Sequence, residues 1–195
     1  MAFIVGIDEA GRGPLAGPVA VGVVMAKQGF VKKFCAGIKD SKKLSPADRE
    51  LWFTLAIEAK KRGELDFTVA LVSEKVIDKR GITYAIKLGI KRCLATLKVP
   101  SDAQIFLDGS LKAPEEFRYQ KTIIKGDEKI PIISLASIAA KVVRDRRMTR
   151  LAKIFPQYGF EVHKGYGTLA HMRAIGKYGL TASHRRSFLK AFDTR

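Results

Sequence analysis

The sequence predicts an α/β fold, with a mixed sheet flanked by helices and a mostly helical C-terminal end. Three observations lead there. Short β-rich apolar runs come early, helical patterns accumulate late, and the composition is that of an ordinary globular protein, with 47% hydrophobic and 28% charged residues. No repeat or low-complexity linker divides the chain. We therefore expect residues 1–195 to form a single catalytic domain whose last ~45 residues are a helical subdomain.

The first elements follow from turn and cap residues. The apolar runs 3–7 and 19–25 flank a turn rich in glycine and proline, which predicts two neighbouring antiparallel strands, the first ending before Asp8. Ser45 is a typical N-cap and Pro46 a typical first helical residue, so a helix should begin there and run to about Arg62. Its expected apolar face consists of Leu51, Leu55, Ile57 and Ala59.

The later elements follow from apolar periodicity, which is 2 in strands and 3.6 in helices. The longest predicted helix is apolar at first and basic later, and Pro156 should end it. Thr168 is suited to be the N-cap of the next helix. In chain order, we expect a strand over 66–72, a short helix from Ser73, a helix over 83–97, buried strands over 103–107 and 119–124, and helices over 134–155, 169–178 and near 188–192.

Charge is the unusual property of this chain. It has 36 Lys and Arg residues against 19 Asp and Glu, a formal net charge of +17. From Ser137 to the end, 13 residues are basic and 3 are acidic. Such a field attracts polyanions, which favours a nucleic acid as partner. The alternative is lysine enrichment of a solvated surface for heat tolerance, and the charge alone leaves both open.

The same composition excludes other classes. No apolar run approaches the ~20 residues needed to span a bilayer, so no membrane partner is expected. The N-terminus lacks the pattern of a secretory signal. Two isolated cysteines, Cys35 and Cys93, are typical of reduced thiols. We therefore expect a cytoplasmic protein.

Acidic residues follow three of the apolar runs. Asp8 and Glu9 follow the first strand, Asp108 follows another, and Asp127 comes soon after a third. Sites in α/β folds gather where strands end, so these four carboxylates could converge. Their mutual repulsion would be relieved by divalent cations, and two Mg²⁺ or Mn²⁺ ions could support hydrolysis of a phosphodiester. Singly, however, each acid could equally be a turn former.

The residues around the first acids resemble a known family. The block Gly6-Ile7-Asp8-Glu9-Ala10-Gly11-Arg12-Gly13-Pro14 resembles the signature of ribonuclease HII, the bacterial type 2 ribonuclease H. The resemblance continues in order through Asp40-Ser41-Lys42-Lys43-Leu44-Ser45, Leu107-Asp108-Gly109, Lys125-Gly126-Asp127, Ala136-Ser137-Ile138-Ala139-Ala140-Lys141-Val142, Arg144-Asp145-Arg146, Lys164-Gly165-Tyr166-Gly167-Thr168 and His184-Arg185-Arg186-Ser187-Phe188.

The resemblance implies an RNase H-like fold and a metal-dependent endoribonuclease. The implied substrates are RNA–DNA hybrids and ribonucleotides embedded in duplex DNA, cut on the 5′ side of a ribonucleotide to leave 3′-hydroxyl and 5′-phosphate ends. The implied cofactors are two divalent ions, Mg²⁺ or Mn²⁺. A monomer is expected, and whether it docks on a replication clamp is left open.

The resemblance also implies residue roles. The family's catalytic, metal-binding acids fall on Asp8, Glu9, Asp108 and Asp127. Its substrate-binding residues fall on six further positions. Gly11, Arg12 and Gly13 correspond to a turn that reads the ribose 2′-hydroxyl largely through backbone atoms, Tyr166 to a tyrosine that senses the RNA–DNA junction, and Ser41 and Lys42 to a phosphate-contacting loop. A 2′-hydroxyl is the group that distinguishes RNA from DNA, which agrees with an unobstructed backbone turn.

Some features depart from the family or fall outside its pattern. Gly167 stands where proline or alanine is expected, which could loosen the tyrosine loop. No extra domain precedes the signature, so we expect ribonuclease HII rather than ribonuclease HIII. Asp145 lies in a basic run and is predicted to form an ion pair on its helix. The three histidines are spread along the sequence and are expected to have surface or structural roles.

Two other classes stay open. One is a non-catalytic nucleic-acid-binding protein that uses only the basic surface. The other is a different RNase H-like nuclease, such as a junction resolvase, which would share the acids and not need the turn or Tyr166.

Overall fold

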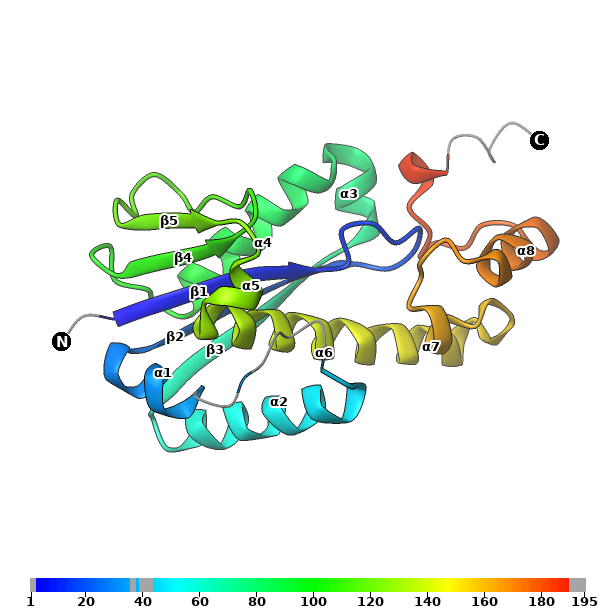
Figure 1. Cartoon of the computed structure of the whole chain (residues 1–195). Helices are drawn as coiled ribbons and strands as arrows, with labels where there is room; N and C mark the ends of the chain where they lie inside the picture. The colour runs from blue at the N-terminus through cyan, green and yellow to red at the C-terminus, as the bar shows by residue number, and fades with distance from the viewer. Residues whose placement is uncertain (1–2, 36–37, 39–43, 190–195) are drawn as a thin grey trace.

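The computed structural model describes residues 3–35, 38 and 44–189, and its elements surround one mixed sheet (Figure 1). The strands are β1 (Phe3–Ala10), β2 (Val19–Lys27), β3 (Leu65–Val72), β4 (Gln104–Asp108) and β5 (Gln120–Ile123). The helices are α1 (Gln28–Phe34), α2 (Pro46–Lys61), α3 (Glu74–Arg80), α4 (Ile82–Thr96), α5 (Gly126–Lys129), α6 (Pro131–Ile154), α7 (Phe160–His163) and α8 (Leu169–Tyr178), with short 3₁₀ helices η1 (Pro156–Tyr158) and η2 (Arg186–Phe188).

The sheet has the order β3-β2-β1-β4-β5. β2 runs antiparallel to β1, as predicted, and also antiparallel to β3, whereas β4 and β5 run parallel to β1. The predicted end of the first strand was wrong, because its pairing with β2 continues through Ala10. Asp8 and Glu9 therefore lie within β1, opposite Gly22 and Val21.

Helices cover both faces of the sheet (Figure 1). Strand alternation turns Val5 and Ile7 toward a core shared with Ile86 and Ile90 of α4. On the other face, Ile4 packs with α6, together with α1 and α2. α6 lies unusually close to β2, since a Cβ at Gly22 would overlap the carbonyl of Ala136. Because Gly22 is opposite Asp8, this approach places the following helix residue, Ser137, beside the acid.

The predicted helix starts are mostly confirmed. Ser45 forms a full capping box with Asp48, and Pro46 is the first residue of α2. Thr168 accepts a hydrogen bond from the N–H of His171 as the N-cap of α8. α6 begins at Pro131, about one turn earlier than predicted.

The predicted apolar face of α2 was partly wrong. Leu51 and Leu55 are 58% and 40% exposed. Ala59 is buried as predicted, and the other buried residues of the helix are Phe53 and Ala56. The two alanines allow a close approach to the sheet that leucines would prevent.

The predicted buried strand over 119–124 was also wrong in its environment. β5 is an edge strand, and its neighbours Tyr119 and Ile124 are 63% and 76% exposed. Helices α1, α5 and α7 were not predicted, because seven, four and four residues are too few to show a helical period. The helix expected near 188–192 is represented by η2, and residues 190–195 lie outside the described residues.

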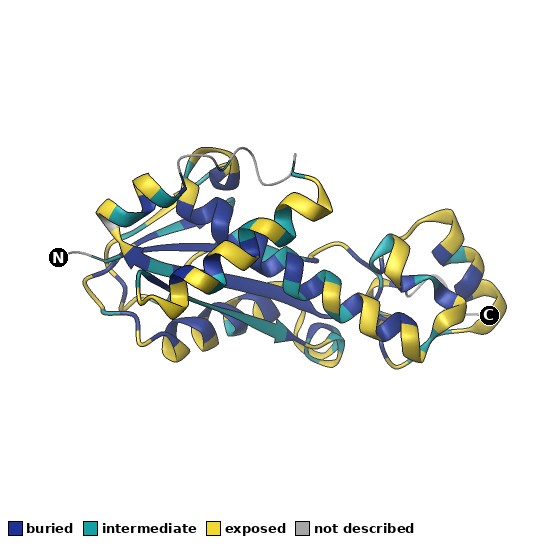
Figure 2. Cartoon of the chain, turned by 90° about the horizontal axis from the view of Figure 1, so that it is seen from below, coloured by how far each residue is buried: buried dark blue, intermediate teal, exposed yellow. Residues whose placement is uncertain are grey.

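The C-terminal elements extend beyond the sheet at the far end of α6 (Figure 2). They pack around a small apolar cluster that includes Met148, Tyr158, Phe160 and Ile175. Ala16, from the turn after β1, is part of the same cluster. The turn is therefore attached to the C-terminal elements as well as to the sheet. Among the described residues, no helix has the length and apolar character to cross a membrane.

Candidate active site

Two of the predicted acids meet where the parallel pairing of β1 with β4 ends. Ile7 pairs with Leu107, so Asp8 and Asp108 occupy the next position on adjacent strands. Asp8 is 5% exposed. Burial, followed by the charge of Glu9 and then that of Asp108, raises the pKa of Asp8 to about 8, although hydrogen bonds from Ser137 and from the N–H of Glu9 oppose the shift. Ionised Asp8 is therefore disfavoured at this edge.

The third acid is attached to the same strand ends by backbone contacts. The N–H of Gly126 donates to Oδ1 of Asp108 over 2.6 Å. Asp127 comes next in α5 and is fully buried. The hydroxyl of Ser134 in α6 donates to the carbonyl of Asp127 over 2.5 Å. β4, α5 and α6 thus fix Asp127 beside the end of β4.

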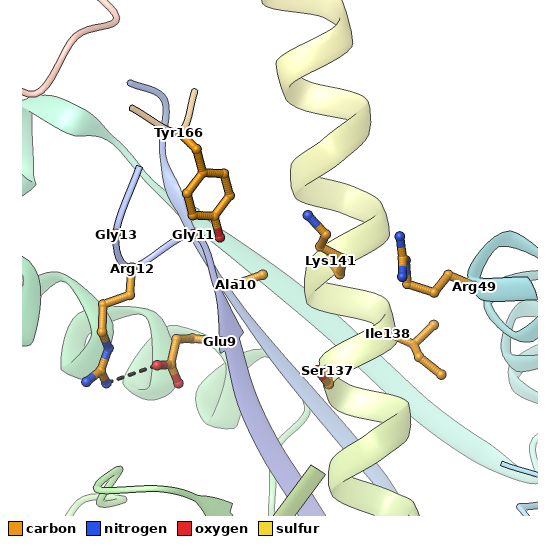
Figure 3. Close-up of a pocket in the computed structure, with 10 residues that line it drawn as sticks. All are labelled: Glu9, Ala10, Gly11, Arg12, Gly13, Arg49, Ser137, Ile138, Lys141 and Tyr166. Carbon is orange, nitrogen blue, oxygen red and sulfur yellow. Dashed lines mark ion pairs between the residues drawn. The ribbon is translucent and has the colours of Figure 1, made fainter. Parts of the chain in front are cut away.

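Glu9 turns away from Asp8, as neighbours on a strand do. Its Oε1 forms an ion pair of 2.9 Å with Arg12 (Figure 3). Its Oε2 is buried and has no hydrogen-bond partner among the described residues. Burial raises the pKa of Glu9, Arg12 lowers it and Asp108 raises it further.

The donor chemistry of these acids fits a hard divalent cation. All are carboxylates, the ligands that Mg²⁺ and Mn²⁺ prefer. A cation would also relieve the repulsion that raises the pKa of Asp8. Within residues 3–35, 38 and 44–189, however, no three His, Cys, Asp or Glu side chains form a group that could already hold a metal. Glu9 is instead paired with Arg12.

A pocket of about 350 Å³ lies beside Glu9. Figure 3 shows its two walls. The turn at Gly11–Gly13 and Tyr166 form one wall, and α6 forms the other with Ser137 and Lys141. Arg49 from α2 lies behind α6 and completes the lining. The pocket is thus open beside an acid and surrounded by cations.

Two buried arginines hold the turn after β1 through hydrogen bonds to its backbone carbonyls. Arg185 donates to the carbonyls of Gly11, Arg12 and Gly17 over 2.7, 2.8 and 2.9 Å. Arg144 donates to the carbonyls of Pro18 and Ala16 over 3.0 and 3.3 Å.

Their burial has electrostatic consequences. Burial, and then the charge of Arg144, lowers the pKa of Arg185 to about 10. Gly11 has a φ of +88°, and a Cβ there would overlap the Arg144 side chain. The turn is therefore fixed by two buried cations whose supporting role was not predicted. The burial of Arg144 could have been predicted from helical spacing, because it lies four residues from both Ala140 and Met148, on the buried side of α6.

Tyr166 is presented by a loop packed on the turn. The N–H of Leu15 donates to the carbonyl of Gly165 over 2.8 Å. The Tyr166 ring is 45% exposed and its centroid lies 6.0 Å from the Arg144 guanidinium. The loop and the turn therefore form one unit.

The other predicted residues have different outcomes. Gly13 is exposed beside the pocket. Ser41 and Lys42 lie outside the described residues. Asp145 pairs with Lys141 over 3.0 Å, which confirms the predicted ion pair on the helix. The histidines are close together in space, and His171 and His184 are buried, so the structural role is confirmed and the surface role is wrong for these two.

Comparison with known sequences identifies a family. Residues 5–191 match the model of the family described as Ribonuclease HII. The ribonuclease HII of Caldicellulosiruptor saccharolyticus is 44% identical over 189 residues, which cover 96% of this chain and 87% of that protein. That of Acetivibrio thermocellus is 46% identical over 190 residues, covering 97% of this chain and 71% of that protein.

Solved structures have the same fold. Ribonuclease H2 from Pyrococcus horikoshii OT3 gives a TM-score of 0.74 at 27% identity, covering 99% of this chain and 100% of that one. The RNase HII of the PCNA:RNase HII complex from Archaeoglobus fulgidus gives 0.73 at 30% identity, covering 94% and 93%. Bst-RNase HIII in complex with Mn²⁺ gives 0.67 at 19% identity, covering 100% and 71%, a likeness of fold alone. The predicted RNase H-like fold is confirmed.

Proposed function

The chain belongs to the ribonuclease HII family and is a ribonuclease H, and on this premise we propose that it cuts the phosphodiester on the 5′ side of a ribonucleotide. The proposed substrates are RNA–DNA hybrids and ribonucleotides embedded in duplex DNA, and the products carry 3′-hydroxyl and 5′-phosphate ends. One observation carries the proposal: Glu9, Arg12 and Tyr166 line the same pocket. Acids suited to hydrolysis therefore adjoin a turn and a ring suited to a sugar.

Asp8, Glu9, Asp108 and Asp127 are the residues proposed to hold two divalent ions, Mg²⁺ or Mn²⁺. When bound, such ions supply an activated water and stabilise the leaving oxygen. The chain itself keeps the ligands in place. Ser137 hydrogen-bonds Asp8, and the N–H of Gly126 orients Asp108.

The turn at Gly11–Gly13 is proposed to read the ribose. A 2′-hydroxyl both donates and accepts, so backbone groups without a large side chain can surround it. Arg185 supports this by fixing the carbonyls of Gly11 and Arg12. A rigid turn can distinguish ribose from deoxyribose because, without the 2′-hydroxyl, its backbone polar groups would be left without a hydrogen-bond partner. Tyr166 is proposed to contact the same ribose and the deoxyribose that follows.

A second, basic groove suggests the path of the duplex. It has a volume of about 520 Å³ and shares Arg49 with the pocket. Its lining includes five basic residues, Arg49, Arg146, Arg150, Lys153 and Lys164, against three acidic ones, Glu50, Asp145 and Glu161. We propose that a phosphate backbone follows it and that Ser41 and Lys42 contact phosphates near the cut. The net charge of +17 would then serve binding.

Further proposals concern the working form of the protein. We propose that residues 1–195 act as one catalytic unit, with the last ~45 residues as a helical subdomain. A cytoplasmic monomer is proposed as well. Sedimentation at several concentrations would test the monomer. A clamp partner stays open for this chain.

The central test is a DNA duplex with one embedded ribonucleotide, incubated with Mg²⁺ or Mn²⁺. We expect a single cut on the 5′ side of the ribonucleotide and none in an all-DNA duplex of the same sequence. End-labelling would identify the 3′-hydroxyl. Cleavage of long hybrids alone would restrict the proposal to hybrids, and cleavage at other positions would overturn the assigned bond.

The same assay addresses the two alternative classes. A binding protein would retain the duplex at low salt and release it at high salt, with no dependence on Asp8 or metal. A resolvase would cut a four-way DNA junction that contains no ribose. Neither result is expected.

A further inference from the structure

Three histidines that are distant in sequence lie together beneath the Tyr166 loop. The rings of His163 and His171 stack with centroids 4.4 Å apart, and those of His171 and His184 are 5.3 Å apart. Phe160 packs edge-on against His171, and Tyr158 lies 5.1 Å from His184. This is an aromatic, poorly hydrated environment, in which each ring nitrogen needs a partner.

The contacts of His184 define where its proton resides. The N–H of Thr181 donates to Nδ1 of His184 over 2.9 Å, and the Thr181 hydroxyl lies 2.9 Å from the same atom. Because it accepts from the N–H, Nδ1 carries a lone pair. A neutral imidazole then has its hydrogen on Nε2. That atom lies 3.1 Å from Nε2 of His171, so His184 donates and His171 accepts.

The assignment continues to the tyrosine loop. Since Nε2 of His171 accepts, its hydrogen must be on Nδ1. Nδ1 lies 2.9 Å from the carbonyl of Tyr166, which can only accept. His163 is separate from this chain of bonds, because its Nδ1 accepts from the N–H of Gly165 and its Nε2 donates to Tyr158 over 2.7 Å.

We propose that His184 and His171 form a neutral hydrogen-bond relay that positions Tyr166, running from the Thr181 N–H through both rings to the Tyr166 carbonyl. Its importance for selectivity rests on the proposed role of Tyr166 at the sugar. The relay begins next to Arg185, which holds the turn. Consecutive residues therefore fix the two elements proposed to read the ribose, Arg185 the turn and His184 the tyrosine loop.

The surroundings favour neutral rings. Burial lowers the pKa of His171 and that of His184. The charged and titratable neighbours that affect His184 are His171, Arg186 and His163, all of which oppose a further positive charge. A neutral N–H···N bond suits this site because it leaves no buried charge.

The first test reads the tautomers directly and needs no nuclease activity. The full chain would be labelled with ¹⁵N-histidine and its imidazole spectra recorded at pH 7.5. We expect His171 in the Nδ1–H form and His163 and His184 in the Nε2–H form, with a scalar coupling between the facing Nε2 atoms. An Nε2–H or doubly protonated His171 would overturn the relay, even in an enzyme that cuts as proposed.

The second test compares two substitutions of one residue. In His171→Asn the side-chain amide can replace the Nδ1 donor, whereas in His171→Gln the amide lies nearer the Nε2 position. We expect His171→Gln to lower the preference for an embedded ribonucleotide over a uniform hybrid by about tenfold, the worth of one hydrogen bond. His171→Asn should retain most of that preference. Equal losses in the two variants would contradict a positioning role.

A control separates positioning from stability. Ile175→Val removes a methyl group from the same apolar cluster and does not touch the relay. It should lower Tm and leave both the tautomers and the ratio of the two kcat/KM values unchanged. A change in that ratio for Ile175→Val would show that any loosening of the cluster has the same effect, which would overturn the proposal.

Discussion

The guanidinium of Arg185 donates to the carbonyl of Gly11 over 2.7 Å, although 174 positions separate the two residues in sequence. The contact joins the C-terminal segment to the turn after β1. It also places a buried cation under the backbone that is proposed to meet the ribose. The first prediction follows from it.

Arg185→Lys should destabilise the protein and loosen the turn. A lysine has a single ammonium and cannot reproduce the planar set of donors that reaches Gly11, Arg12 and Gly17. We expect a loss of about 2–3 kcal/mol in the free energy of unfolding, because buried carbonyls lose their donors. Urea denaturation would measure it. A stability equal to that of the parent chain would mean that the carbonyls find other donors.

Asp8→Asn and Asp108→Asn should abolish turnover and leave duplex binding nearly intact. The expected loss of rate is at least ~10³-fold, because each carboxylate is a proposed metal ligand. In EDTA, Asp8→Asn should also be more stable than the parent chain by roughly 1 kcal/mol or more, since it removes a buried acid whose ionised form is disfavoured.

Single-turnover cleavage would measure the loss of rate, fluorescence anisotropy the duplex binding, and thermal melts the stability. The matched control is Asp145→Asn, which breaks the ion pair with Lys141 on the neighbouring turn of α6. It should retain most of the activity. Loss of binding in Asp8→Asn would instead assign the acid a structural role.

Tyr166→Ala should reduce selectivity more than catalysis. The half-exposed ring lines the pocket with Glu9 and is not a proposed metal ligand. Its loss should therefore lower kcat/KM on a single embedded ribonucleotide by about 10–100-fold, the effect of a lost stacking contact and disturbed positioning. A uniform hybrid should be affected less. Tyr166→Phe retains the ring and should lie close to the parent. Equal loss on every RNA-containing substrate would refute the sugar-reading role.

Gly167→Ala should tighten the tyrosine loop. A Cβ at Gly167 would lie 3.0 Å from Cδ1 of Leu15, the end of a side chain that can adjust. The substitution should raise the free energy of unfolding by roughly 0.5 kcal/mol, because alanine lowers the conformational entropy of the unfolded chain. It should also sharpen the preference for embedded ribonucleotides. A lower Tm would show that the Leu15 side chain cannot move to accommodate the added methyl group.

The contribution of His184 to stability should fall as the pH is lowered from about 6.5 to about 4, whereas Asp8, whose pKa is raised, contributes with the opposite sign over the same range. Burial, and then the charge of His171, lowers the pKa of His184 from 6.5 to about 4. In that window His184 binds more protons in the unfolded chain than in the folded one, so at this residue acidification favours unfolding. His184→Gln should remove part of this slope, on the order of 1 kcal/mol after allowance for solvent screening. Identical slopes in melts across this range would contradict the assignment.

Much of the fold could be predicted because its signals are local. Ser45 and Thr168 cap their helices within four residues of sequence, and the apolar runs before Asp8 and Asp108 mark strands directly. The exposed leucines of α2, the edge position of β5 and the extension of β1 were missed. Each depends on which surface the element meets, and periodicity does not encode that.

The sequence by itself determined most of the longer elements, the positive charge, and the motif that assigns the family. Only the tertiary structure decided that Glu9 turns to Arg12, that Arg144 and Arg185 are buried under the turn, and that His171 meets His184. The physical reason is the range of the interactions. Caps and periods act over a few residues, whereas these contacts arise when the turn after β1, the end of α6 and the C-terminal segment pack around one apolar cluster.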